Sequence, residues 1–237
     1  MMMKKLVSAL AVLLTASIAG ATGIEPFQAD FTVSRNGKDL GAMKMQLSKA
    51  APGELLFVSR TEGTKGLASW LGVTIEERSE LSLTEAGLST RSYRYVQDMV
   101  GRHLERELKL MPEGKVSEKD GDKSWTYKAD RAILDRHSVV LGIAAKLRAG
   151  VDAGAVFDLR VASKGLSENW RFLIVGDEEI ETGNGTVATV RVERVRENSD
   201  RKTISWHALQ YNYLPVKVEQ VEPDGERLVS LLKHFVE

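Results

Sequence analysis

The sequence predicts a mainly β (α+β) protein, built from a large curved antiparallel sheet around one central amphipathic helix. Apolar residues recur at every second position in many short segments separated by turns, as expected for strands with one buried face. Only residues 133–150 show a long helical period. Because twist accumulates and sheets beyond about ten strands curl or split, we expect a half-barrel or open barrel closing around that helix. A closed barrel and a two-sheet β-sandwich plugged by the helix remain open alternatives.

The N-terminal residues have the pattern of a secretory signal peptide, residues 1–21. Lys4 and Lys5 precede an apolar run that starts at Leu6, and small residues lead to Ala21, which is typical of a cleaved signal. The apolar run is shorter than the roughly 20 residues that a membrane span needs. The chain has no cysteine, so we expect neither a lipoprotein nor disulfides. We therefore predict a periplasmic protein, cleaved near Ala21, with residues 22–237 as a single β-rich domain that does not span the membrane.

Charge gives no sign of a nucleic-acid partner. The chain has 33 basic and 33 acidic residues, and both signs are interspersed along the strands. A nucleic-acid-binding surface needs a clustered basic excess. We interpret the charges as solvated strand faces and expect a monomer.

Residues 27–128 are expected to form an antiparallel meander. Phe27, Ala29, Phe31 and Val33 alternate with polar residues, and a tight-turn signal follows at residues 36–37. The next strand carries Met43, Met45 and Leu47 on one face. Further strands are predicted at residues 55–61, 73–83, 88–97, 102–111 and 123–128, with turns at residues 113–114 and 120–121.

The helix is predicted within residues 133–150. Asp135 can accept a hydrogen bond from a free N–H at its start, and Gly150 can end it in a left-handed turn. The buried face is formed by residues spaced three or four apart and widened by their neighbours: Val140, Leu141, Ile143, Ala144, Ala145 and Leu147. Strands then resume at residues 156–162, 167–175, 187–197 and 202–208, from residue 215, and at 227–235.

Three segments in order resemble the exported bacterial family of domain-of-unknown-function 3108 (DUF3108). The first has the order D-x-x-S … L-R-x-G, and the second the order E-x-x-x-T-x-x-G-x-x-x-T. The residues that carry the resemblance are Asp135, Ser138, Leu147, Arg148 and Gly150, then Glu178, Thr182, Gly185 and Thr189, then Trp206, Leu214 and Pro215. The resemblance implies an exported domain and transfers no catalytic residue. The expected architecture is also similar to that of the periplasmic carriers LolA and LolB, without a carrier-specific motif.

The sequence offers no recognisable catalytic or metal motif. The four histidines are scattered, without H-x-x-x-H or H-E-x-x-H spacing, and there is no G-x-S-x-G segment or cysteine nucleophile. His137 lies beside Asp135 and Ser138, but neighbours at a helix start do not converge on one point, so capping is the better interpretation. We expect a protein that is not an enzyme, with no catalytic residue, cofactor or metal.

Aromatic and flexible apolar residues are the remaining candidates for binding. Such side chains usually fill a core, but on a concave sheet face they could hold an acyl chain or stack on a sugar ring. Trp70 and Leu71 lie in a glycine-bounded segment, residues 63–72, which could either fold over the sheet or form the rim of a groove. The predicted ligand-binding residues are Trp70, Leu71, Met43, Met45, Trp125, Trp206 and Leu141.

The leading hypothesis is a non-enzymatic periplasmic protein that binds a lipid, acyl chain or other hydrophobic envelope component in a groove between sheet and helix. The alternative is an envelope scaffold or polysaccharide-associated module without a cavity, whose partner is an envelope protein or glycan. An envelope hydrolase using Asp or Glu is the third hypothesis.

Overall fold

Fourteen strands in the described part of the chain form one antiparallel sheet. The computed structural model describes residues 25–84, 87–129 and 132–236, so the predicted signal peptide lies outside the described residues. The strands are β1 (Phe27–Arg35), β2 (Lys38–Ala51), β3 (Glu54–Gly63), β4 (Thr74–Thr84), β5 (Gly87–Met99), β6 (Arg102–Leu110), β7 (Lys115–Asp120), β8 (Lys123–Lys128), β9 (Val156–Ser163), β10 (Leu166–Thr182), β11 (Gly185–Val195), β12 (Lys202–Ala208), β13 (Leu214–Val221) and β14 (Arg227–Val236).

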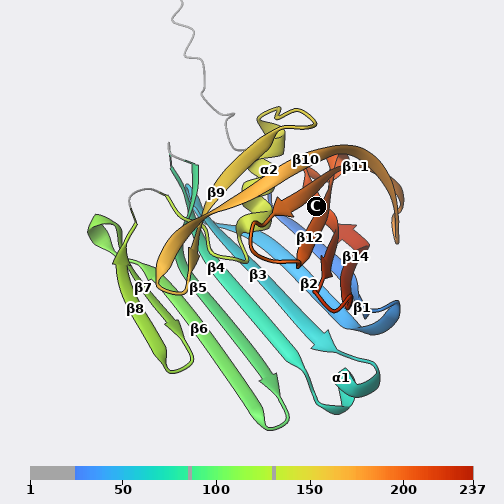
Figure 1. Ribbon diagram of the computed structural model, residues 1–237, viewed down its shortest axis with the longest axis horizontal. Helices are drawn as coiled ribbons and strands as arrows, with labels where there is room; N and C mark the ends of the chain where they lie inside the picture. The colour runs from blue at the N-terminus through green and yellow to red at the C-terminus, as the bar shows by residue number, and fades with distance from the viewer. Residues whose placement is uncertain (1–24, 85–86, 130–131, 237) are drawn as a thin grey trace, which may run out of the picture.

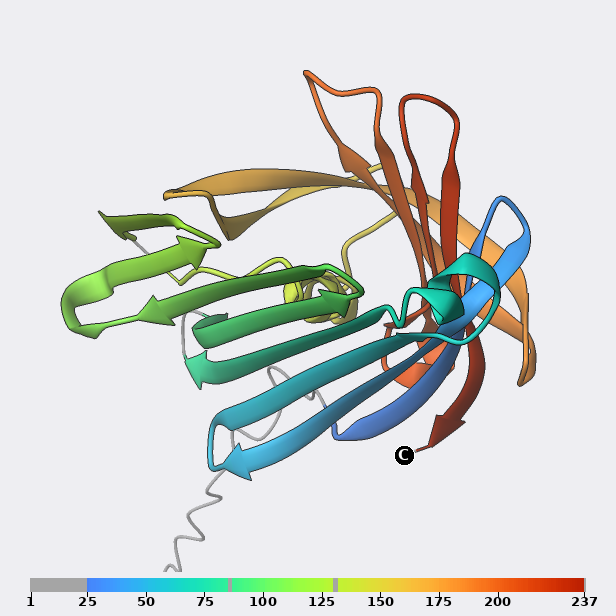
Figure 2. The same cartoon turned by 90° about the horizontal axis from the view of Figure 1, so that it is seen from below.

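The sheet consists of two meanders joined by the first and last strands. The strand order is β8-β7-β6-β5-β4-β3-β2-β1-β14-β13-β12-β11-β10-β9, and Thr32 of β1 lies opposite Leu231 of β14. Figures 1 and 2 show the two halves as walls on either side of the helix α2 (Val139–Arg148). The sheet is open, with β8 and β9 as its edges. The predicted fold class is therefore confirmed.

The first strand illustrates how alternation produces this sheet. Phe27, Ala29, Phe31 and Val33 are all buried, while the residues between them face outward or lie at intermediate depth. Asn36 and Gly37 have φ angles of +50° and +76°, the left-handed conformations that a two-residue hairpin turn requires. The turn fixes the pairing of β1 with β2, and with it the face that each side chain takes.

The helix begins at Val139, later than the predicted start at Asp135, because residues 136–138 form a turn; residues 133–134, before the predicted cap, are extended. The N–H of Thr90 donates to the carbonyl of Ile133 at 2.8 Å, and the N–H of Leu134 donates to the carbonyl of Arg160 at 2.8 Å. Leu134 also forms a parallel bridge with Val161. This segment thus connects β5 with β9, and its backbone groups are used across the sheet instead of within a helix.

Helix α2 is buried on almost every side, because it lies between the two halves of the sheet. Leu141 packs in a cluster with residues of β1–β4 and β11–β14. Ile143 and Leu147 pack in a second cluster with β9, β10 and β11. Gly142 fits closely in this packing: a Cβ there would lie 2.5 Å from Leu134 Cδ1, so that side chain would have to shift.

Three local predictions are corrected by the structure. β7 was not predicted, since Val116 is its only buried apolar residue. The segment 63–72 contains a short helix, α1 (Gly66–Trp70), at the end of the β3–β4 hairpin. β10 continues beyond residue 175 through an irregularity between Ile174 and Gly176.

Short 3-10 turns occur at Pro112–Gly114 and Leu209–Tyr211. Within the described ranges, no helix is long and apolar enough to cross a lipid bilayer.

Candidate functional site

A cleft of about 530 Å³ lies between the start of α2 and the C-terminal half of the sheet. We call it the α2 cleft. Its volume lies within the range of roughly 300–1,000 Å³ that is typical of small-molecule sites. The lining residues are Arg136, Val139, Val140, Ile143, Ser163, Lys164, Glu168, Trp170, Phe172, Arg194, Arg196, Arg201, Thr203, Ser205, Val218 and Gln220.

One side of the α2 cleft is apolar. Val140 and Ile143 are three residues apart on α2 and therefore share a helix face. Trp170 and Phe172 are two residues apart on β10, so both point towards α2. Val218 of β13 completes the apolar side. Val140 is only half-buried, unlike its neighbours Val139 and Leu141, because the cleft lies beside it.

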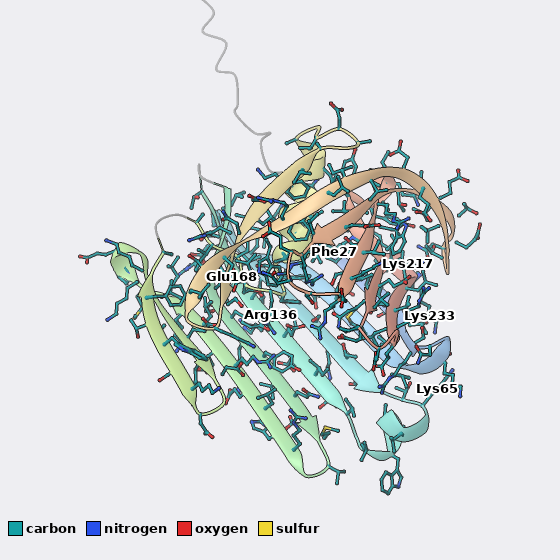
Figure 3. The ribbon with its side chains drawn as sticks, viewed as in Figure 1. Phe27, Lys65, Arg136, Glu168, Lys217 and Lys233 are labelled. Carbon is teal, nitrogen blue, oxygen red and sulfur yellow. The ribbon has the colours of Figure 1, made fainter. Side chains whose placement is uncertain are left out.

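The other side is strongly basic. Five lining side chains are cationic, and Glu168 is the only carboxylate among them. The guanidinium of Arg194 lies 3.3 Å from the ring centroid of Trp170, and Trp170 Nε1 donates to Glu168 Oε2 at 3.1 Å. Figure 3 labels Arg136, in the turn before α2, and Glu168, near the start of β10. Burial, reinforced by Arg196, lowers the pKa of Arg194 to about 10, so its side chain is still protonated at neutral pH.

Two of the arginines are held by neighbouring groups. Arg196 donates to the carbonyl of Arg201 at 3.2 Å and to Thr203 Oγ1 at 3.0 Å. Arg201 pairs with Glu222 at 2.8 Å. Among the described residues, neither Arg136 nor Arg194 forms an ion pair. Lys164 and Arg196 also have no carboxylate partner there, so Arg201 is the one cation of the α2 cleft that the described residues pair with a carboxylate.

A buried polar cluster anchors the start of α2 beside the cleft; we call it the Asp135 cluster. Asp135 Oδ1 accepts hydrogen bonds from the backbone N–H groups of His137 at 2.8 Å and Ser138 at 2.9 Å. Its carboxylate also accepts from Ser79 Oγ at 3.1 Å and Thr90 Oγ1 at 2.7 Å. Asp135 thus caps the turn that leads into the helix and fixes it to β4 and β5.

The Asp135 cluster contains Ser, His and Asp but lacks the arrangement of a catalytic triad. Ser79 Oγ contacts His137 Nδ1 at 2.9 Å and also binds Asp135, whereas a triad places serine and aspartate on opposite ring nitrogens. Ser79 is fully buried. His137 stacks on Phe57 with 4.0 Å between ring centroids, and burial lowers its pKa to about 4. The cluster is a structural anchor with a neutral histidine.

The predicted residues Trp70 and Leu71 do not lie at the rim of the α2 cleft. Trp70 belongs to α1 and is 79% exposed, and α1 lies at the far end of the β3–β4 hairpin from α2 (Figure 1). Neither residue lines the cleft. The glycines that bound this segment allow the chain to turn outward instead of folding over the sheet.

The other predicted ligand-binding residues are packed inside the protein or at a different hairpin. Leu141 and Trp206 are buried in the same core cluster, and Met43 and Met45 pack against it. Trp206 Nε1 donates to Glu178 Oε2 at 2.9 Å. Trp125 of β8 packs against the β9–β10 turn, where a Cβ on Gly165 would lie 2.4 Å from its ring. The structure does not bring these residues together around a ligand-sized space.

The sequence contains one indication of the basic side of the cleft, the alternating arginines near residue 194, which we interpreted as part of a solvated strand face. Val192, Arg194 and Arg196 follow the period of two along and just beyond β11, so Arg194 and Arg196 share the face of Val192, which packs against α2. Cations on such a face point into the protein and are not part of a solvated surface. Within residues 25–84, 87–129 and 132–236, no group of three or more His, Asp or Glu could hold a metal ion.

An open antiparallel sheet around one helix, with a cleft beside that helix, defines a β-barrel-like domain. The chain belongs to the family described as "Protein of unknown function (DUF3108)", whose model matches residues 30–233. The resemblance in the three sequence segments is thus confirmed.

One solved structure supports the fold, and a second is more distantly similar. A β-barrel-like protein of domain of unknown function DUF1849 from Brucella abortus has a TM-score of 0.57 at 12% identity, covering 89% of this chain and 96% of that chain. A DUF1089 family protein from Pseudomonas aeruginosa has a TM-score of 0.37 at 10% identity, covering 78% and 88%. No curated protein matches the sequence. At 12% identity the likeness to the Brucella protein extends to the fold alone.

Proposed function

We propose that the protein is a non-enzymatic binding protein of the cell envelope, which holds a lipid or other hydrophobic component in the α2 cleft. The observation that carries this proposal is the apolar wall of the cleft. Val140 and Ile143 of α2 face Trp170 and Phe172 of β10 across a space of about 530 Å³. Concave sites with an apolar lining and a few polar groups are typical of small-molecule binding.

Burial of an acyl chain is sufficient to drive such binding. Each methylene transferred from water to an apolar site contributes about 0.8 kcal/mol. Five methylenes therefore contribute about 4 kcal/mol, which corresponds to roughly a thousandfold in affinity. The open side of the cleft would leave the polar end of the ligand near solvent and the basic residues.

The N-terminal pattern supports the proposed location. A signal peptide cleaved near Ala21 would deliver the domain to the periplasm. There, lipids and acylated molecules are available to a protein with an apolar cleft.

The first test is native mass spectrometry of the protein purified from periplasm without detergent, followed by organic extraction. We expect an adduct of lipid mass that the extraction removes. A fluorescent fatty acid then measures affinity for wild type and for Val140→Phe, which places a ring in the cleft. Val175→Phe is the matched control, because Val175 is exposed and follows inward-facing Ile174 on β10.

Val140→Phe should weaken binding about tenfold or more, and Val175→Phe should not. Circular dichroism checks that both variants are folded. If the wild-type protein carries no adduct and binds no fatty acid, the proposal is refuted. If it binds but both variants bind as tightly as wild type, the ligand lies elsewhere and the assignment to the α2 cleft fails.

A further inference from the structure

The charge of the α2 cleft is far from that of the protein as a whole. The whole chain has a formal net charge of zero, yet the cleft has five cationic side chains and one carboxylate. A cleft lined by charges of one sign, with low-dielectric walls, concentrates the electrostatic field inside it. Apolar and cationic surfaces thus meet in one site, which is the complement of an amphiphile with an anionic end.

Arg194 is arranged to bind an oxyanion. Its guanidinium stacks on Trp170, which fixes the plane of the group and leaves its N–H edges directed sideways. Its Nε is a buried donor with no hydrogen-bond acceptor among the described residues. Buried donors are nearly always satisfied in folded proteins, so this N–H points to an acceptor that the described residues do not provide.

Like charges surround this donor. Arg136, Arg196 and Arg201 all act on Arg194, and Glu168 is the carboxylate that opposes them. Glu168 also accepts a hydrogen bond from Trp170. A second depression, also of about 530 Å³, shares Glu168, Trp170, Arg194 and Arg196 with the α2 cleft. Arg194 therefore lies where the α2 cleft continues into a second, open depression, whose lining includes three arginines and two glutamates.

We infer that the ligand of the α2 cleft is a phospholipid of net negative headgroup charge, with its phosphate bound by Arg194 and Arg136 and its acyl chain against Val140 and Phe172. This inference rests on the proposed function and specifies its ligand class. Arginine forms paired, charge-assisted hydrogen bonds to phosphate oxygens. A zwitterionic headgroup also carries a positive group. That group would lie near Arg136 and Lys164, and repulsion between the like charges would lower the affinity.

The test compares two lipid probes that differ only in headgroup. Phosphatidylglycerol and phosphatidylcholine, with the same acyl chains and the same fluorophore, are titrated into the full chain below their micelle-forming concentrations. We expect phosphatidylglycerol to bind about tenfold more tightly. The difference should shrink as salt is raised, since partly exposed charges are screened.

Variants then assign the headgroup contact. Arg194→Gln and Arg136→Gln should each weaken phosphatidylglycerol binding, Arg194→Gln by about tenfold, and narrow the difference in affinity between phosphatidylglycerol and phosphatidylcholine. Arg136 is exposed, so Arg136→Gln keeps the test valid if Arg194→Gln does not fold. Arg78→Gln is the matched control, because Arg78 is exposed on β4 and pairs with Glu80 at 3.2 Å, outside the cleft.

The outcomes separate this inference from the proposed function. Equal binding of both lipids, with both cleft variants neutral, refutes the headgroup inference and leaves hydrophobic binding intact. Failure of the folded wild-type protein to bind either lipid refutes both. Inorganic phosphate is added as a competitor: if it displaces the labelled lipid as effectively as unlabelled phosphatidylglycerol does, the site recognises free phosphate and the inference is wrong.

Discussion

Acid should destabilise this protein well above the pH at which its carboxylates titrate, because two histidines are buried in neutral form. Burial lowers the pKa of His207 and of His137 from 6.5 to about 4. His207 is satisfied as a neutral ring, with Nδ1 at 2.8 Å from the carbonyl of Tyr213 and Nε2 at 2.8 Å from Ser205 Oγ. In the unfolded chain both rings gain protons near pH 6.5, whereas in the folded protein they do not.

The direction and size of the change in unfolding free energy with pH follow from this difference in pKa. A group with a lower pKa in the folded state binds more protons when the chain unfolds, so stability falls as pH falls. At about 1.4 kcal/mol per pKa unit, each histidine accounts for roughly 3 kcal/mol over the whole range from about pH 6.5 to pH 4. Between pH 7.5 and 5 the loss should be about 2 kcal/mol each. Together that is a large share of the roughly 5–15 kcal/mol stability of a typical domain.

Urea unfolding followed by tryptophan fluorescence, at several pH values between 7.5 and 5, measures the effect. His207→Gln removes one titrating ring and should reduce the loss by about half. His234→Gln is the matched control, since His234 is exposed, and it should leave the pH dependence unchanged. Burial raises the pKa of Glu77, which stabilises the folded state as pH falls. The comparison between variants cancels this opposite contribution.

A free energy of unfolding that is flat between pH 7.5 and 5 would refute the reasoning for both rings. A loss of the same size in His207→Gln and in wild type would refute it for His207 alone.

Three further changes test the packing. Asp135→Ala removes an acceptor of four buried hydrogen bonds and should cost about 2–4 kcal/mol, measured by urea unfolding; a cost below about 1 kcal/mol would contradict its role as the anchor of α2. Leu141→Ala leaves a cavity between the two walls and should cost about 2–5 kcal/mol, whereas Val100→Ala, at a 71% exposed position, should stay within about 0.5 kcal/mol. Gly165→Ala forces a Cβ into the ring of Trp125 at a φ of +87° and should lower the melting temperature by several degrees, about 2–4 °C per kcal/mol; an unchanged melting temperature would mean that this turn is not constrained.

Periodicity predicted most of the strands because a half-buried strand has apolar residues at every second position, and these show which face is buried. Phe27, Ala29, Phe31 and Val33 all face the core as their spacing indicates. The same periodicity did not predict β7, because Val116 is the only buried residue in that strand. It also placed the helix start too early: α2 begins at Val139, and the residues before it bond to Ser79, Thr90 and Arg160, distant partners that leave no local pattern.

The α2 cleft lies between helix and sheet, where we expected a groove, but none of the predicted ligand-binding residues lines it. Aromatic identity does not distinguish the exposed Trp70 from the buried Trp206. Arg194 was missed because alternating cations on a strand usually face solvent. Only the pairing of β11 with β10 and β12, and the position of α2 against it, shows that this face points inward.

The pairing of β1 with β14 has a consequence for how the chain reaches its native state. Asn36 Oδ1 accepts a hydrogen bond from the N–H of Arg227, 191 residues along the chain, at 2.9 Å. The centre of the sheet is thus completed by the segments most distant in sequence, which implies high contact order and slow folding. Until β14 joins, β1 and β13 are two bare edges at the middle of the structure, the places most open to association with another chain. Linking the two ends and opening the chain at another hairpin would make this pair local, and such a circular permutant should fold faster.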